Sequence, residues 1–403
     1  MVYVSMDLRS RALRLHRESK GKMEVVFKVP MDSMEDLSLA YSPGVAEPCI
    51  EIHNNPSTIY DYTAKGNLVA VVTDGTAVLG LGDIGPGAAL PVMEGKAILL
   101  KRFAGVDAFP ICLDTKNVDE IVQIVKALSP TFGAINLEDI SAPRCFEIED
   151  RLRMELDIPV FHDDQHGTAI VVGAGLQNAM KLVNKTTNNV KVVINGAGAA
   201  GMAILKVLLQ LGYTNIIMCD STGIIYEGRE QGMNPIKQSI ANLTNPLGLT
   251  GSLKDAMEGS DIFIGVSVAN LLTKELVLSM NTDSIIFALA NPNPEISYEL
   301  AKEWGVRVVA TGRSDYPNQV NNVLAFPGIF RGALDVRATD INEHMKLVAV
   351  EAIASLVNVN ELKDDYIIPR ALDERVVQVV AKAVSEAAIS SGVSTLYQPV
   401  LKS

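Results

Sequence analysis

Short apolar runs alternate along the chain with segments of helical or polar character, and this alternation predicts an α/β protein with parallel strands. Two of the runs, residues 132–135 and 158–161, end abruptly in carboxylates. Each is typical of a buried strand, and open α/β sheets bind ligands at the carboxyl ends of such strands. The acids that follow the two runs are Glu138, Asp139, Asp163 and Asp164.

Four acids at one sheet edge would repel one another and lose hydration unless a cation lay among them. Oxygen ligands favour a hard divalent ion, Mg²⁺ or Mn²⁺. Because both acid pairs interrupt apolar runs, the pattern favours a metal site over two solvated acidic turns. His162 and His166 are a rival ligand set for zinc or iron. Their i, i+4 spacing aligns them only on a helix, whereas residues 158–161 indicate a strand.

A second pattern, which begins at the apolar strand 191–195, predicts dinucleotide binding. A glycine-rich loop and a helix follow it, and the next strand ends in Asp220, 19 residues after Gly201, as expected of an acid that binds ribose hydroxyls. Asp220 would repel the 2′-phosphate of NADP, which favours NAD, although Ser221 and Arg229 leave NADP open. The residues predicted to contact the cofactor are Gly196, Gly198, Ala199, Ala200, Gly201, Asp220 and Asn291.

Three further predicted strands, at 261–266, 284–289 and 306–310, continue a doubly wound parallel sheet. An earlier GxGxxG string, residues 80–85, lacks the acid at the expected spacing and is interpreted as a glycine-rich turn beside a site. From residue 339 onward the chain is predicted helical, with an apolar stripe and a capping box of Asp340 and Glu343. The expected parts are a substrate and metal domain, a Rossmann domain and C-terminal helices, at residues 1–164, 165–338 and 339–403.

Two further side chains are candidates for catalysis. Lys96 lies in a predicted helix, residues 91–103, with apolar residues at i±3 and i±4, so it must reach solvent, lower its pKa or find a carboxylate. The last two outcomes make it a candidate general base. Tyr41 precedes a Ser-Pro-Gly turn and is either a packing residue or a functional one. Asn291 and Asn322 lie in turns, where they either cap the backbone or hold a carboxylate.

Composition narrows the class of protein. The chain has 403 residues, 48% of them apolar and 20% charged, and a net charge of -12 at pH 7. This charge argues against nucleic acid and anionic membranes as partners. The four cysteines are far apart and form no CxxC pair, which indicates buried thiols of a reducing compartment. We recognise neither a signal peptide nor an apolar run long enough to span a membrane, so the cytoplasm is expected.

Several sequence blocks, in this order, resemble the compact microbial type of malic enzyme in its catalytic region. The likeness runs from about residue 30 to the end. The blocks are AYSPGVAEP (40–48), VTDG (72–75), LPVMEGK (90–96), LEDI (137–140) and FHDDQHGT (161–168).

The resemblance implies roles for individual residues. Tyr41 matches the general acid of the family, Lys96 its general base, and Asp163 the carboxylate that pairs with the lysine. Glu138, Asp139 and Asp164 match the metal ligands, and Asn291 and Asn322 the amides that hold the substrate. The chain departs from larger members at Ala77, where they carry an arginine. Arg102 and Arg144 are alternative candidates for the clamp on the substrate carboxylate.

Motifs and resemblance together predict oxidative decarboxylation of (S)-malate to pyruvate and CO₂, dependent on Mg²⁺ or Mn²⁺, with reduction of NAD or NADP. The family also implies a homodimer. Two other classes stay open at this point. An oxaloacetate decarboxylase that makes no use of the nucleotide would need the acids but not the glycine loop, and a non-catalytic NAD-sensing regulator would need no base such as Lys96.

Overall fold

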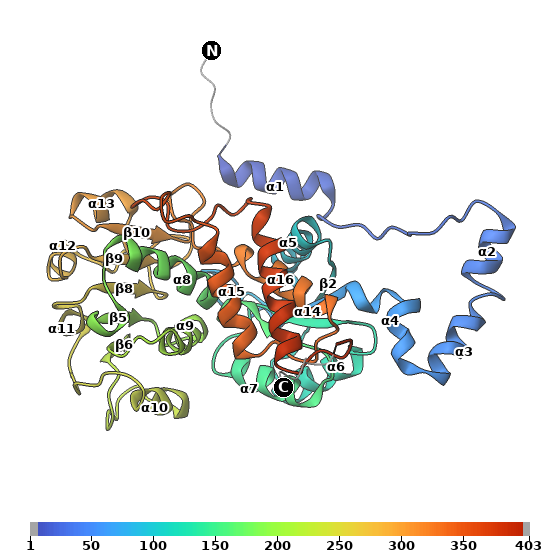
Figure 1. Cartoon of the computed structure of the whole chain (residues 1–403), viewed down its shortest axis with the longest axis horizontal. Coiled ribbons are helices and arrows are strands. Elements are labelled where there is room, and N and C mark those ends of the chain that lie inside the picture. Colours follow the sequence, from blue (N-terminus) through green and yellow to red (C-terminus); the bar gives the residue numbers. More distant parts are fainter. Residues whose placement is uncertain (1–6, 398–403) are drawn as a thin grey trace, which may run out of the picture.

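The computed structural model describes residues 7–397, which form two sheets of mainly parallel strands joined and covered by helices (Figure 1). The first sheet is all parallel, in the order β2-β1-β3-β4. The apolar runs that precede the acid pairs form β3 and β4, so both strands end directly at the acids. The four strands are β1 (Leu68–Thr73), β2 (Asp107–Cys112), β3 (Ala134–Leu137) and β4 (Val160–His162).

Three helices connect the strands of the first sheet: α5 (Pro86–Ala104), α6 (Val118–Leu128) and α7 (Arg144–Glu155). The helix that carries Lys96 is α5, and it begins earlier than predicted. Pro86 occupies its first position, where the missing N–H is not needed, and Pro91 lies inside the helix. Helix α5 packs against β1, β2 and a C-terminal helix, so its inner face is enclosed.

The long helix α8 (Asp163–Leu182) starts immediately after β4. The small residues after the acid pairs predict a helix that begins only at Gly167. The expectation was wrong, because the strand ends at His162 and the two aspartates occupy the first turn of the helix. Carboxylates are favourable there, since they face the positive end of the helix dipole.

The second sheet confirms the predicted doubly wound fold, with the strand order β10-β9-β8-β5-β6-β7. All its neighbours are parallel except β6 and β7, an antiparallel pair that the pattern did not predict. Its strands are β5 (Val192–Asn195), β6 (Ile216–Asp220), β7 (Gly223–Ile224), β8 (Ile262–Gly265), β9 (Ile285–Ala288) and β10 (Val308–Thr311). Its helices are α9 (Ala199–Gln210), α10 (Pro235–Ala241), α11 (Leu253–Met257), α12 (Lys274–Leu278) and α13 (Tyr298–Glu303).

The C-terminal helices α14 (Phe326–Asp335), α15 (Glu343–Ser355) and α16 (Arg375–Ser390) join the two sheets. Helix α14 packs on α5 and α16, and α15 packs on α8 and α16 (Figure 1). One hydrophobic core therefore includes both Val71 of β1 and Ile194 of β5. The predicted capping box was wrong: Asn342 caps α15 by accepting from Met345 N, and Asp340 instead binds Arg153.

The segment before the first sheet has a different character. It contains α1 (Leu8–Ser19), α2 (Met34–Ala40), α3 (Ala46–Asn54) and α4 (Ile59–Tyr62), with 3₁₀ turns at Pro56–Thr58 and Ala64–Asn67. We call residues 24–63 the N-terminal arm; none of them is buried. Helices α2 and α3 stand away from the body of the molecule (Figure 1). Among the helices of residues 7–397, none has the length and hydropathy to cross a bilayer.

Candidate active site

Four carboxylates gather where β3 and β4 end. Glu138 and Asp139 directly follow β3, and the first turn of α8 supplies Asp163 and Asp164. The first three are buried, whereas Asp164 is partly exposed. One carboxylate oxygen from each of Glu138, Asp139 and Asp164 lies within 4.8 Å of the others. The structure thus brings together the acids that the sequence pattern placed at one sheet edge.

Lys96 points from α5 into this acidic edge. Its ammonium pairs with Asp163 Oδ2, lies 3.1 Å from Glu138 Oε1, and sits 4.6 Å from the centroid of the Phe326 ring. Burial acts to lower the pKa of Lys96, but the charges of Asp163, then Glu138 and Asp164, outweigh burial and raise that pKa above its ordinary value. Lys96 therefore does not extend to solvent and carries its proton in this form of the protein.

The remaining charge of the acidic edge is unbalanced. Burial, followed by the charge of Asp164, raises the pKa of Asp139 to about 7. Burial likewise raises the pKa of Glu138. Asp139 Oδ2 is buried without a hydrogen-bond partner. A single lysine against four acids leaves room for a cation, and a donor set of carboxylate oxygens fits a hard divalent ion such as Mg²⁺ or Mn²⁺.

The two histidines of the rival ligand set do not join this cluster. His166 lies in the first turn of α8, where Nε2 is 2.7 Å from Glu149 Oε1 and Nδ1 is 3.1 Å from Lys346 Nζ. His162 is buried at the end of β4, where neither ring nitrogen has a hydrogen-bond partner and Nδ1 lies 3.9 Å from Asp164 Oδ2. Within residues 7–397, the three acids Glu138, Asp139 and Asp164 are the group whose side chains could close on one ion.

The glycine-rich loop at the end of β5 has the shape that a dinucleotide needs. Gly196 has a φ of +123°, and a Cβ there would lie 2.5 Å from the carbonyl oxygen of Val266. A Cβ on Gly201 would lie 1.8 Å from the carbonyl oxygen of Gly196, so helix and strand pack too closely for any side chain. Gly198, by contrast, faces open space. Helix α9 begins next to it, at Ala199 rather than at residue 202 as predicted, which brings its N-terminus to the loop.

Asp220 ends β6 as predicted, but its carboxylate is already engaged. It accepts hydrogen bonds from the backbone and hydroxyl of Thr222, from both terminal nitrogens of Arg229, and from Lys237 Nζ at 2.7 Å. Burial acts to raise the pKa of Asp220, yet these donors hold it well below its ordinary value. The sequence suggested a free acid that would repel a 2′-phosphate, whereas here two cationic side chains outnumber one carboxylate.

The loops of the two sheet edges meet. A Cβ on Gly80 would lie 2.2 Å from the carbonyl oxygen of Asn291, so the turn 80–85 packs on the loop after β9. Asn322, in the turn η4 (Asn322–Leu324), lies close to α8, since its Cβ is 3.1 Å from where a Cβ on Gly167 would stand. Asn322 is thus near the acids, whereas the exposed Asn291 lies near the glycine-rich turn.

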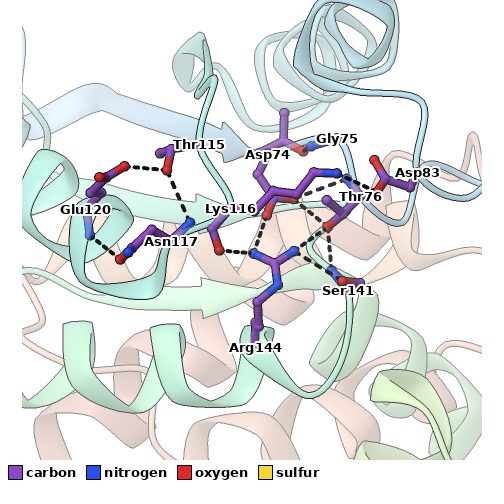
Figure 2. Close-up of polar contacts among 11 residues, drawn as sticks. Asp74, Gly75, Thr76, Asp83, Thr115, Lys116, Asn117, Glu120, Ser141 and Arg144 are labelled. Carbon is purple, nitrogen blue, oxygen red and sulfur yellow. Dashed lines mark hydrogen bonds and ion pairs between the residues drawn. The ribbon is translucent and has the colours of Figure 1, made fainter.

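Other predicted residues lie elsewhere. Tyr41 is 67% exposed at the C-terminal end of α2, on the N-terminal arm and away from the body that carries Lys96 (Figure 1). Arg102 is exposed and pairs with Glu374. Arg144 is bound within the protein: it donates to Asp74, Thr76, Ser141 and the carbonyl of Lys116 (Figure 2). Neither arginine offers a free guanidinium to a substrate carboxylate beside the acids.

Two neighbours of the site were missed from the sequence. Asn136 donates to Glu138 Oε2 at 3.0 Å, and the alternation of residues along a strand could have placed these two on one face. Phe326 lies under the Lys96 ammonium. No local sequence pattern predicts this contact, because α14 and α5 are far apart in the sequence.

Residues 20–153 match the family model for the malic enzyme N-terminal domain, and residues 165–389 match the one for the malic enzyme NAD-binding domain. The chain belongs to the malic enzyme family. The predicted resemblance is therefore confirmed. Among relatives, the bifunctional malic/malolactic enzyme of Bacillus subtilis strain 168 is 65% identical, over 97% of this chain and 95% of that protein.

Two more malic enzymes illustrate the similarity. The NAD-dependent malic enzyme of Geobacillus stearothermophilus is 61% identical over 93% of this chain and 78% of its own length. The crystal structure of the NAD-dependent malic enzyme of Thermotoga maritima has a TM-score of 0.90 and 53% identity, covering 93% of this chain and 98% of that one. The fold class predicted from the sequence agrees with this family.

Proposed function

We propose that this malic enzyme converts (S)-malate into pyruvate and CO₂ while reducing a nicotinamide nucleotide. The name of the 61% identical Geobacillus stearothermophilus relative supports NAD over NADP, although Arg229 and Lys237 neutralise Asp220. The observation that carries the proposal is the position of the Lys96 ammonium, buried between Asp163 and Glu138 at a sheet edge that meets the loops of the nucleotide-binding sheet. A base, a group of unbalanced carboxylates and a nucleotide loop are the parts that oxidation of a hydroxyl acid requires.

Lys96 serves as the general base. In its neutral form it would take the proton from the C2 hydroxyl of malate, and a bound nicotinamide nucleotide would supply the acceptor for the C2 hydride. Asp163 holds the lysine side chain in place and keeps it charged until the site is loaded. A cation bound to Glu138 and Asp164 would neutralise their charges. The negative potential that holds the proton on Lys96 would then be weaker.

Glu138, Asp139 and Asp164 would hold the divalent cation, and Asn322 would orient the substrate from the facing loop. The cation would supply Lewis acidity toward the oxygens of the substrate. The buried, unpartnered Oδ2 of Asp139 supports this assignment, because a carboxylate oxygen without a donor is costly unless a cation completes it. Asn291 is assigned to both substrate and nucleotide, since its loop follows β9 at the shared edge.

We further propose that the enzyme works as a homodimer in which the arm of one subunit supplies Tyr41 to the site of the other. Tyr41 is the proposed acid that protonates C3 after CO₂ leaves, yet it ends α2, and this helix stands away from the body of its own chain (Figure 1). The arm also exposes apolar side chains along its length, including Val25 (87%), Phe27 (78%) and Leu39 (70%). An unburied apolar arm needs a partner surface, and a second copy provides one.

Mixed dimers test the exchange of Tyr41. Tyr41→Phe and Lys96→Ala chains should each be inactive alone. Co-expressed in equal amounts, they should regain about a quarter of wild-type specific activity, because half of the dimers would contain one site with both residues intact. If Tyr41 served its own subunit, every mixed site would lack one residue, and the mixture would stay inactive.

The reaction itself is tested by following nucleotide reduction with malate and Mn²⁺, using NAD and NADP in turn, with and without a chelator. We expect NADH formation that the chelator abolishes, and slower turnover with NADP. Loss of CO₂ from oxaloacetate without reduction of either nucleotide would show a decarboxylase instead. Nucleotide binding without any turnover would show a regulator.

A second activity, conversion of malate to lactate and CO₂, is favoured by the name of the 65% identical Bacillus subtilis relative. It requires that the hydride taken from malate return to C2 of pyruvate before NADH leaves, so that the net redox change is zero. Protonated Lys96 would supply the new hydroxyl proton. Lactate should then form from excess malate with trace NAD and without accumulated NADH, and its absence would rule out this activity.

We also propose a cytoplasmic enzyme with domains divided near residues 164 and 338. The four cysteines are free thiols, which suits a reducing compartment, but only Cys145 and Cys219 are buried as expected. Helix α8 spans the first boundary, so a cut between β4 and α8 should separate the acids of the site. Expression of residues 1–162 alone should therefore give a chain that does not bind Mn²⁺.

A further inference from the structure

Arg144, the first residue of α7, is the centre of a polar cluster beside the acidic edge (Figure 2). Its Nη1 donates to Asp74 Oδ2 at 2.7 Å and to the carbonyl oxygen of Lys116 at 2.9 Å. Its Nη2 donates to Thr76 Oγ1 at 2.9 Å and to Ser141 Oγ at 3.2 Å. The Asp74 side chain is fully buried, so its carboxylate depends on protein donors rather than on solvent.

The partners of Arg144 lie on three loops, which follow β1, β2 and β3. Asp74 and Thr76 come after β1, Lys116 after β2 and Ser141 after β3. A planar guanidinium with donors in a fixed fork holds several acceptors in one geometry, which a lysine cannot do. Figure 2 shows the guanidinium of Arg144 inserted between these loops, with its polar partners converging on it. The cluster therefore fixes the loops relative to one another.

This cluster is joined to the backbone around Asp139. Thr76 Oγ1 accepts from Ser141 N at 3.0 Å, and Ala77 N donates to the carbonyl oxygen of Asp139 at 2.9 Å. Asp139 itself has a φ of +53°, in the left-handed region that a residue with a side chain rarely adopts. Such a conformation persists only where the surroundings hold it. Here Thr76 of the Arg144 cluster and its neighbour Ala77 hold the N–H of Ser141 and the carbonyl of Asp139.

We propose that Arg144 is a positioning residue for the divalent cation, acting through the backbone of residues 138–141. By holding the left-handed turn at Asp139, it directs the carboxylates of Glu138 and Asp139 toward Asp164. The inference rests on the proposed function, because it takes these three acids as the cation ligands. Arg144 touches none of the three carboxylates and is not a substrate clamp, since both of its terminal nitrogens are occupied by protein acceptors.

The test compares two arginines of the same helix. Arg153 also lies on α7 and forms a two-fold ion pair, with Asp340, away from the acids. Their side chains are similarly exposed, at 24% for Arg144 and 26% for Arg153. The measurement is the Mn²⁺ dissociation constant of nucleotide-free protein, by calorimetry or electron paramagnetic resonance, with thermal unfolding recorded alongside.

Arg144→Met should raise the Mn²⁺ dissociation constant by roughly 10- to 100-fold, the usual cost of losing an outer partner of a metal ligand. Arg153→Met should lower the unfolding temperature and leave Mn²⁺ affinity unchanged. Arg144→Lys should fall between Met and wild type, because it keeps the charge without the fork. Equal Mn²⁺ affinity of Arg144→Met and wild type would overturn the inference.

Two further variants keep the result interpretable. Thr76→Val removes one hydroxyl from the cluster with little change in volume, and it should weaken Mn²⁺ several-fold even if Arg144→Met fails to fold; unchanged affinity would count against the proposal. Asp164→Asn reports on the proposed function instead. If wild type does not bind Mn²⁺, or if Asp164→Asn binds it as well as wild type, the cation site itself is wrong.

Discussion

The acids at the ends of β3 and β4 in the first sheet and the acid at the end of β6 in the second sheet are in opposite electrostatic states. At β3 and β4, four carboxylates share one lysine, and burial raises the pKa of Asp139 to about 7. At β6, the single carboxylate of Asp220 accepts from Arg229, Lys237 and Thr222, and its pKa is lowered. Both arrangements follow from acids placed at the carboxyl ends of parallel strands.

The contrast shows how an edge with unpaired acids differs from an edge whose acid is already paired by protein donors. Asp220 is complete without a ligand, because protein donors satisfy its oxygens. The edge of β3 and β4 is incomplete, because buried oxygens of Asp139 and Asp163 have no partner. A buried carboxylate without a hydrogen-bond partner lowers stability unless a cation or ligand binds to it. Ligands are therefore expected at such sites. Four predictions test this contrast.

Removal of Lys96 should have the largest effect. Lys96→Ala should lower malate oxidation by about 10²- to 10⁴-fold, the range for loss of a general base. Nucleotide binding, measured by fluorescence titration of NADH, should be unchanged because the loop after β5 is untouched. Turnover close to that of wild type would remove the lysine from the mechanism.

Asp220→Asn should destabilise the fold by about 3 kcal/mol, since it leaves the buried Arg229 without a charged partner. Urea unfolding monitored by circular dichroism would measure this change. The Lys254–Glu275 pair is exposed on the same domain, so Glu275→Gln provides a control with little expected effect. If both variants lose the same stability, Asp220 is not the structural acid described here.

The two edges should respond to pH in opposite directions in metal-free protein. Asp139 has a raised pKa when folded, so its contribution is present at acidic pH and is lost as pH rises toward about 7. Asp220 has a lowered pKa, so its contribution is present above the ordinary aspartate value and is lost as pH falls below it.

Between pH 5 and pH 8, the free energy of unfolding of the wild type should fall by on the order of 2 kcal/mol relative to that of Asp139→Asn. Wild type should lose its stability advantage over Asp220→Asn only as the pH falls into the acidic range. The same pH trend for both variants would contradict the contrast between the edges.

The smallest effect is expected from relief of repulsion. Asp164→Asn keeps an oxygen that can accept from Asp139 N, a bond of 2.7 Å, but removes one charge from the cluster. Metal-free protein should gain about 1 kcal/mol of stability and should no longer be stabilised by Mn²⁺. A loss of stability in the metal-free variant would show that the acids are balanced after all.

Much of the second sheet and of the acidic edge was predictable, because both are local patterns. The loop from Gly196 to Gly201 and the acids after β3 and β4 lie directly next to apolar strands, so periodicity alone places them. The apolar neighbours of Lys96 likewise lie within one turn of its own helix. These features need no knowledge of the rest of the chain.

Features that depend on distant pairs were not predictable. Asp340 was expected to cap a helix, but it binds Arg153, which is 187 positions away. The donors around Asp220 come from a loop and a helix whose paths the sequence does not reveal, and the pattern therefore suggested a free acid. The motif around Tyr41 identified it as a candidate residue. No motif predicts the direction in which the N-terminal arm extends from the body.

Helix α8 runs from one functional edge into the other half of the molecule. Its first turn carries Asp163 and Asp164, while its body packs on α9, which follows the glycine loop, and on α15. If a bound nucleotide moves α9, helix α8 would move with it. The positions of Asp163 and Asp164, and with them the affinity for the ion, would then change. Occupancy of either site should then alter affinity at the other by the same factor.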